Sequence, residues 1–142
     1  MKPFALLLLG LVLSVLSSSA QTPTKSAPAA AVPAAAATPR NVSPAEFDKL
    51  RGATNTVILD VRTPSEFAEG HLPDAKLLDY RSPNFAAEVA KLDKSKTYLV
   101  HCAAGGRSAR ACTKMISLGF TNVVNLDGGL GAWTDAGKPL VK

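Results

Sequence analysis

Apolar residues along this chain form short continuous runs that alternate with segments of helical spacing. Residues 57–61 and 97–101 are nearly uninterrupted apolar runs, which is typical of strands covered on both faces of a parallel sheet. Shorter strands are predicted near residue 41 and at residues 76–79 and 123–126. Because helical segments separate the strands, the pattern predicts an α/β fold, with one mainly parallel five-stranded sheet and helices on both faces.

Four helices are predicted between and after these strands. Ser43 caps the first, Pro44 stands in its first turn and Glu46 follows three residues after the cap, which predicts a helix over residues 44–51. The second helix opens near residue 82 and extends to residue 92. The third runs over residues 107–118 with an inward stripe of Ala109, Cys112, Met115 and Ile116. Trp133 is expected to anchor a short last helix in the core.

The first 39 residues differ in composition from the rest of the chain. Residues 1–20 combine a basic start at Lys2, an apolar run over residues 4–16 and small residues at 18 and 20, the layout of a secretory signal peptide cleaved after Ala20. An uncleaved anchor is the alternative, although a membrane span needs roughly 20 apolar residues. Residues 21–39 are rich in Ala and Pro and predict a disordered linker. We expect residues 40–142 to form the domain of a periplasmic protein, with no stable membrane insertion after cleavage.

Charge and cysteine content exclude several classes of function. The formal net charge is +5, but Lys2, Lys25 and Arg40 belong to the N-terminal region, and the other 13 basic and 11 acidic residues nearly cancel. This balance argues against nucleic acid as a partner. Two cysteines and two histidines lack the spacing of a zinc site, so no metal and no cofactor are expected. A disulfide between Cys102 and Cys112 is disfavoured by its geometry, and Cys112 is expected on the buried face of its helix.

The candidate chemistry lies directly after the strand at 97–101. Cys102 ends that strand, and four small residues separate it from a helix that begins at Arg107. These residues are Ala103, Ala104, Gly105 and Gly106. Such a loop can direct several backbone N–H groups at one point, where the helix dipole adds positive potential. A thiol in that cradle is biased toward the nucleophilic thiolate; a buried structural cysteine is the alternative interpretation.

Three motifs resemble signatures of the rhodanese family of sulfurtransferases. The active-site pattern C-x-x-G-x-R-S, with six positions from cysteine to arginine, is matched by Cys102, Gly105, Arg107 and Ser108. An N-terminal signature is matched by Asp60-Val61-Arg62, Glu66-Phe67, Gly70-His71-Leu72-Pro73 and Ala75, with Asp74 in place of the usual glycine. A C-terminal signature is similar to Gly128-Gly129 and Ala132-Trp133. The resemblance covers roughly residues 40–136 and implies a rhodanese-like domain.

The resemblance implies sulfur transfer in two steps. Cys102 would take a sulfane sulfur from thiosulfate or a related small anion and hold it as a persulfide. A thiophilic acceptor, cyanide in vitro or a thiol in the cell, would then take the sulfur. Arg107 would bind the donor or orient the loop, and Ser108 would cap the helix or donate to the site. The implied substrate-binding residues are Ala103, Ala104, Gly105, Gly106, Arg107 and Ser108, and we expect a monomer.

Two other functions stay open at this point. A non-enzymatic persulfide carrier or partner-binding module would load Cys102 with sulfur but show negligible turnover. A phosphatase or arsenate-reductase-like hydrolase on the same fold is disfavoured by the loop, because the related phosphatases have one residue more between cysteine and arginine.

Residues near the loop are expected to support it. Asp60 ends a central strand, at the edge where open α/β sheets place their sites, and is expected to approach Arg107 or the Cys102 loop. Arg62 is expected to pair with Glu66 and hold the segment after the strand, and Phe67 to pack inward.

Three further residues have chemistry that a structural role accounts for equally well. His71 is interpreted as a hydrogen-bonded turn residue rather than a catalytic group. Arg81 could steer an anionic substrate, or be a solvated loop residue. His101 precedes Cys102, but neighbours on a strand point to opposite faces, which disfavours His101 as a base.

Overall fold

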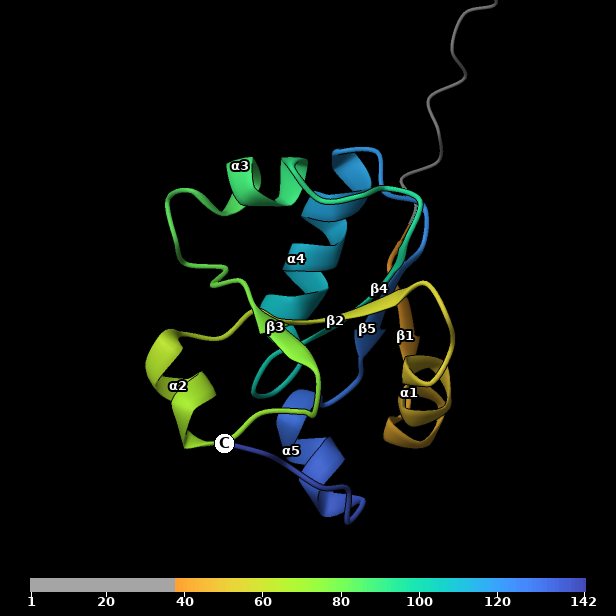
Figure 1. The fold of residues 1–142 in the computed structure, drawn as a ribbon, viewed down its shortest axis with the longest axis vertical. Coiled ribbons are helices and arrows are strands. Elements are labelled where there is room, and N and C mark those ends of the chain that lie inside the picture. Colours follow the sequence, from red (N-terminus) through yellow and green to blue (C-terminus); the bar gives the residue numbers. More distant parts are fainter. Residues whose placement is uncertain (1–37) are drawn as a thin grey trace, which may run out of the picture. The chain divides into compact units, whose positions relative to one another are not determined.

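The computed structural model describes residues 38–142, in which five strands alternate with five helices (Figure 1). The strands are β1 (Arg40–Val42), β2 (Thr56–Asp60), β3 (Ala75–Leu77), β4 (Thr97–His101) and β5 (Val123–Leu126). The helices are α1 (Pro44–Arg51), α2 (Pro64–Glu69), α3 (Phe85–Ala90), α4 (Gly106–Ser117) and α5 (Gly129–Asp135). The predicted signal peptide and all but the last two residues of the predicted linker lie outside this range. None of the helices in it is long and apolar enough to cross a membrane.

All five strands form one parallel sheet in the order β1-β5-β4-β2-β3. The central strand β4 pairs with β2 so that His101 stands beside Asp60 at the carboxyl ends of the two strands. Helices follow both of these ends, and the carboxyl edge is where ligands bind in open parallel sheets. The predicted fold class is confirmed.

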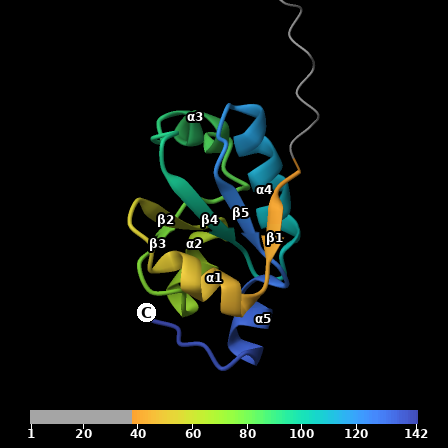
Figure 2. The same ribbon diagram turned by 90° about the vertical axis from the view of Figure 1, so that its right-hand side faces the viewer.

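Side chains alternate between two hydrophobic layers, one on each face of the sheet. Leu59 and Cys102 pack in the layer that α3 and α4 cover. Ile58 and Leu99 pack on the other face with Trp133 of α5, in the layer that α1 also covers. Figure 2 shows α4 running alongside the sheet next to β5. Helices therefore cover both faces, and Trp133 is buried as predicted.

Helix α2 is not predicted by the hydrophobic pattern, because none of its residues is buried. A capping box forms it instead. The Thr63 hydroxyl accepts a hydrogen bond from the Glu66 N–H, and the Glu66 carboxylate accepts one from the Thr63 N–H. The signal was present in the sequence, because Thr63-Pro64-Ser65-Glu66 repeats the pattern of Ser43-Pro44-Ala45-Glu46 at the start of α1.

Three smaller differences concern the boundaries and faces of elements. Strand β3 begins and ends earlier than the predicted residues 76–79. Helix α3 begins at Phe85 because the Ser82 hydroxyl accepts the Asn84 N–H in a turn before it. The buried stripe of α4 is rotated from the predicted one and consists of Ser108, Ala111, Cys112 and Met115. This rotation turns the Ser108 hydroxyl toward the end of β4.

Candidate active site

Cys102 stands where β4 ends and the loop of residues 103–105 leads into α4. Figure 1 shows α2, the start of α4 and α5 gathered at this edge of the sheet. The cysteine is only 2% exposed, so a substrate must reach it over the loop. The exposed loop positions, Ala104 and Gly106, carry at most a methyl group, which lets a small anion approach the backbone closely.

Hydrogen-bond donors surround the sulfur of Cys102. The Gly105 N–H donates to Sγ over 3.1 Å, and the Ser108 hydroxyl lies 3.4 Å from Sγ. Burial raises the pKa of the Cys102 thiol, but hydrogen bonds from Ser108 and from the N–H groups of Ala104 and Gly105 outweigh burial and leave the pKa lowered. The arrangement therefore favours the thiolate. By contrast, burial raises the pKa of Cys112 to about 12, and both cysteines are free thiols.

The start of α5 holds the other side of the loop. The Leu130 N–H donates to the Cys102 carbonyl over 2.7 Å, and the Gly131 N–H donates to the Ala103 carbonyl over 3.0 Å. Gly129 has a φ of +59°, and a Cβ atom there would lie 2.6 Å from the Cys102 carbonyl oxygen. Only glycine allows this approach. The sequence analysis identified this glycine pair only as part of a family signature and did not predict its contact with the thiol loop.

Arg107 forms a two-pronged ion pair with Glu66 of α2. Nη1 lies 2.8 Å from Oε2 and Nη2 lies 2.6 Å from Oε1. The Arg107 guanidinium holds the pKa of the Glu66 carboxyl well below its usual range. The prediction that Glu66 pairs with Arg62 is therefore wrong. Since the carboxylate occupies the fork of Arg107, the geometry corresponds to the loop-orienting role rather than to a free donor-binding cation.

Asp60 and Arg62 form a second ion pair, buried below the loop. The Arg62 side chain donates to both oxygens of Asp60, over 3.0 Å from Nε and 2.7 Å from Nη2, and the Arg62 N–H also donates to Oδ1. Arg62 Nη2 further donates to the Gly70 carbonyl over 2.7 Å. Asp60 therefore does not reach Arg107 by a hydrogen bond, because its own neighbour two residues on takes the carboxylate. The pair ties the end of β2 to the turn after α2.

His101 is fully buried on the opposite face of β4 from Cys102. Its Nε2 lies 3.6 Å from Asp60 Oδ2, beyond hydrogen-bond distance, and neither ring nitrogen has a hydrogen-bond partner within residues 38–142. Burial lowers the pKa of His101 to about 4, against the opposing attraction of Asp60. The ring is therefore neutral at pH 7, and its orientation excludes direct proton transfer with Cys102.

The other candidate residues lie away from the sulfur. The His71 ring stacks on Phe67 with ring centroids 3.7 Å apart, and its Nδ1 lies 3.1 Å from the Phe67 carbonyl. His71 is thus a hydrogen-bonded turn residue. Phe67 is only half-buried, so the prediction that it packs inward is wrong. Arg81 is exposed, and its backbone N–H donates to the Asp79 carboxylate.

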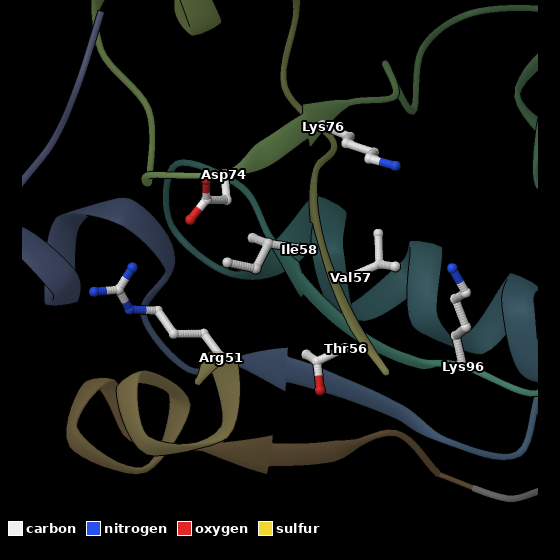
Figure 3. Close-up of a pocket in the computed structure, with 7 residues that line it drawn as sticks. All are labelled: Arg51, Thr56, Val57, Ile58, Asp74, Lys76 and Lys96. Atoms are coloured by element: carbon white, nitrogen blue, oxygen red, sulfur yellow. The ribbon is translucent and has the colours of Figure 1, made fainter. Parts of the chain in front are cut away.

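A separate hollow lies at the opposite edge of the sheet from Cys102. Figure 3 shows this hollow of about 380 Å³ near the amino ends of β2 and β4, where Arg51, Asp74, Lys76 and Lys96 contribute charged side chains. No residue of the Cys102 loop lines it. Within the described part of the chain, no group of three or more His, Cys, Asp or Glu residues could hold a metal ion. The thiol chemistry therefore belongs to the carboxyl edge of the sheet.

Comparison with known proteins bears on what this thiol loop is. The family model of the rhodanese-like domain matches residues 43–136. The protein belongs to the rhodanese family. A sulfurtransferase of Allochromatium vinosum is 32% identical over 93 residues, which cover 66% of this chain and 85% of that protein. The thiosulfate sulfurtransferase GlpE of Stutzerimonas stutzeri is 34% identical over 95 residues, covering 66% of this chain and 84% of GlpE.

Other rhodanese relatives extend the comparison. The mitochondrial protein HIGH ARSENIC CONTENT 1 of Arabidopsis thaliana is 40% identical over 89 residues, which are 56% of this chain and only 53% of that longer protein. The crystal structure of a rhodanese-related protein from Thermoplasma volcanium matches with a TM-score of 0.64 and 29% identity, over 72% of this chain and 97% of that one. These similarities support a rhodanese-family sulfurtransferase.

Proposed function

We propose that the protein moves a sulfane sulfur from thiosulfate, or a related small anion, to a thiophilic acceptor through a persulfide on Cys102. The observation that carries this proposal is the Cys102 sulfur itself. It lies where the loop begins, and the surrounding hydrogen bonds lower the pKa of the Cys102 thiol despite burial. The small residues of the loop and the relatives named as sulfurtransferases support the same reaction.

In the first step, the Cys102 thiolate attacks the outer sulfur of thiosulfate. A new S–S bond forms, the S–S bond of the donor breaks, and sulfite leaves with the electron pair. The Gly105 N–H and the Ser108 hydroxyl, which contact Sγ, would stabilise negative charge on the cysteine and on the persulfide. The lowered pKa of the Cys102 thiol promotes formation of the attacking thiolate.

In the second step, an acceptor attacks the outer sulfur of the persulfide. The S–S bond to Cys102 breaks, and its electron pair returns to Sγ as thiolate. The ion pair with Glu66 holds Arg107 at the start of α4, next to the loop from which the sulfur leaves.

The test is the intact mass of the reduced protein after treatment with thiosulfate and desalting. We expect a gain of one sulfur atom that cyanide removes. The Cys102→Ser variant should gain nothing and lose at least about 10³-fold in turnover, because a serine hydroxyl is a far weaker nucleophile than a thiolate. Circular dichroism of the variant checks that the fold is intact.

Each alternative has its own outcome in this experiment. Persulfide formation without turnover of any acceptor would identify a carrier module rather than an enzyme. Hydrolysis of an aryl phosphate without any sulfur gain would identify the hydrolase. Retained turnover in Cys102→Ser would contradict the assignment altogether. We further propose that the chain is exported to the periplasm through cleavage of residues 1–20, which is supported only by their sequence pattern.

A further inference from the structure

A hollow of about 350 Å³ lies along the outer face of α4. It is lined by Tyr80, Arg110, Thr113, Lys114 and Ser117. Arg110 and Lys114 are exposed, and neither forms an ion pair with any residue in the described range. The hydroxyls of Thr113 and Ser117 donate to helix carbonyls. Two cations beside an aromatic ring therefore define the chemistry of this hollow.

The α4 residues that line the hollow run from Arg110, one turn after the start of the helix, to Ser117 at its end. Arg107, Arg110 and Lys114 are spaced three and four residues apart, which places them on one face of the helix. Helical side chains tilt toward the amino end of their helix, and that end follows directly on the Cys102 loop. Tyr80 is anchored at the same edge of the sheet, since its N–H donates to the Val61 carbonyl over 3.2 Å, and it packs against the hydrophobic layer that includes Cys102.

The charges beside the thiol are not equivalent. Glu66 neutralises Arg107 through two short hydrogen bonds. Arg110, one turn further along α4, and Lys114 have no such carboxylate partner in the described range. An anionic group that approaches Cys102 from this side is attracted by these two residues rather than by Arg107.

We propose that this hollow binds the organic part of the sulfur acceptor, a small thiol that carries two carboxylates. The inference rests on the proposed sulfurtransferase function and names the acceptor class. Residues four apart on a helix have Cβ atoms about 6 Å apart, a spacing that suits one carboxylate on Arg110 and one on Lys114. The apolar body of the acceptor lies against Tyr80, and its sulfur points toward Cys102. The acceptor thiolate attacks the outer persulfide sulfur, the S–S bond to Cys102 breaks, and the electron pair remains on Sγ.

The experiment separates the two steps of the reaction. The full chain is loaded with thiosulfate and desalted, and its persulfide is confirmed by mass. The second-order rate constant of sulfur transfer is then measured with mercaptosuccinate, a dicarboxylate thiol, and with uncharged 2-mercaptoethanol. We expect the Arg110→Ala, Lys114→Ala double variant to lose about tenfold with mercaptosuccinate and to be unchanged with 2-mercaptoethanol. The rate constant with mercaptosuccinate is divided by that with 2-mercaptoethanol for each protein. Comparing this ratio between proteins removes the difference in intrinsic reactivity between the two thiols.

Lys49→Ala is the matched control. Lys49 is an exposed lysine on α1, which covers the other face of the sheet, so its loss changes the net charge without touching the hollow. It should leave the ratio of the two rate constants unchanged. The advantage of mercaptosuccinate should also fall with rising salt in the unmodified protein and not in the double variant.

Three outcomes would overturn the acceptor site. An unchanged ratio in the double variant means that the hollow does not bind the carboxylates. Equal losses with both thiols mean that the two cations act on the loop instead. A slower loading by thiosulfate with an unchanged ratio would assign the cations to the donor. If the unmodified protein forms no persulfide, the proposed function itself fails, which is visible before any acceptor is added.

Discussion

Cys102 and His101 are neighbours in the chain but lie in opposite layers of the domain. The cysteine faces α4 and receives hydrogen bonds that lower the pKa of its thiol. The histidine faces the other layer, where burial lowers the pKa of the ring to about 4. The alternation of a strand thus puts two neighbouring residues, both with lowered pKa values, in opposite layers: the shift favours the thiolate of Cys102 and the neutral ring of His101. We propose a chemical role for the cysteine and expect the histidine to affect stability.

His101 predicts a specific dependence of stability on pH. Its pKa is about 4 in the folded protein and about 6.5 when unfolded, so the unfolded chain binds the proton first as pH falls. The contribution of His101 is therefore present above pH 6.5 and is lost as pH falls toward 4. Between pH 7.5 and pH 4.5 this loss is about 2–3 kcal/mol.

Urea denaturation of the protein and of a His101→Gln variant checks this. From pH 7.5 to pH 4.5, the free energy of unfolding should fall by about 2–3 kcal/mol more in the unmodified protein than in the variant, because glutamine does not titrate. Comparing the two proteins removes the contribution of the carboxylates, which titrate in both. An identical pH dependence would mean that the histidine is not held neutral in the fold.

Among the elements, α5 supports the Cys102 loop through backbone contacts that its sequence did not predict. Its first residues hold the Cys102 and Ala103 carbonyls, and Gly129 lies against the loop backbone. The helix N-terminus thereby fixes the loop without contributing a side chain to the chemistry. Substitutions at this distant segment should consequently change the reactivity of the thiol.

Gly129→Ala tests this coupling. The added Cβ would lie 2.6 Å from the Cys102 carbonyl oxygen and 2.8 Å from the Ala104 nitrogen, which forces the loop away. We expect the free energy of unfolding to fall by about 2–4 kcal/mol and the pKa of the Cys102 thiol to rise. The pKa is measured from the ultraviolet absorbance of the thiolate as a function of pH. Gly137→Ala is the control. Gly137 also has a positive φ, +69°, but nothing lies within 4 Å of its Cβ position.

The control separates backbone strain from the clash. Gly137→Ala should lose about 1–2 kcal/mol and leave the thiol unchanged, because only the left-handed conformation is penalised. If both variants shift the pKa of the Cys102 thiol equally, the shift results from general destabilisation of the fold and not from contact between residue 129 and the loop.

Elements with a clear hydrophobic pattern could be predicted, and those held by polar contacts could not. Strands β2, β4 and β5 were predicted to within a residue because continuous apolar runs have one interpretation in an α/β domain. Helix α2 was missed because it buries none of its residues and is formed by a cap.

The same limit applies to the site. The thiol and its loop could be put forward as a candidate from sequence, since the residues are contiguous. The partner of Glu66 could not be predicted from sequence, because Arg107 lies 41 positions away. Arg62, only four positions from Glu66, is an equally plausible partner in the sequence. Arg62 is taken by Asp60 instead, over a separation of two residues. Because Asp60 and the Gly70 carbonyl hold Arg62, the Glu66 carboxylate is left to pair with Arg107.

At the scale of the whole molecule, residues 136–142, which follow α5, pack back onto the domain. His71 and Val141 exchange two backbone hydrogen bonds of 2.9 Å, and the Trp133 indole donates to the Pro139 carbonyl over 2.9 Å. Lys138 pairs with Asp48 of α1 over 2.6 Å. The segment after α5 therefore joins parts of the domain that are distant in sequence.

The N-terminal region gives a prediction for the chain as a whole. When the full sequence is expressed in a bacterium, we expect the protein in the periplasm to begin at Gln21, as shown by its intact mass. A variant without residues 4–16 should remain in the cytoplasm at its full remaining mass. Full-length protein in the periplasmic membrane fraction would instead support the uncleaved anchor, and full-length protein in the cytoplasm would contradict export.

The two hydrogen bonds from α5 to the loop also determine when, during synthesis, the Cys102 loop can take its final form. The thiol leaves the ribosome with β4, but Leu130 and Gly131, which hold the Cys102 and Ala103 carbonyls, are made almost thirty residues later. Until they arrive, the loop lacks two of its backbone anchors and the nascent chain carries an ordinary cysteine. The loop therefore gains both anchors only after α5 has been made and has packed against it.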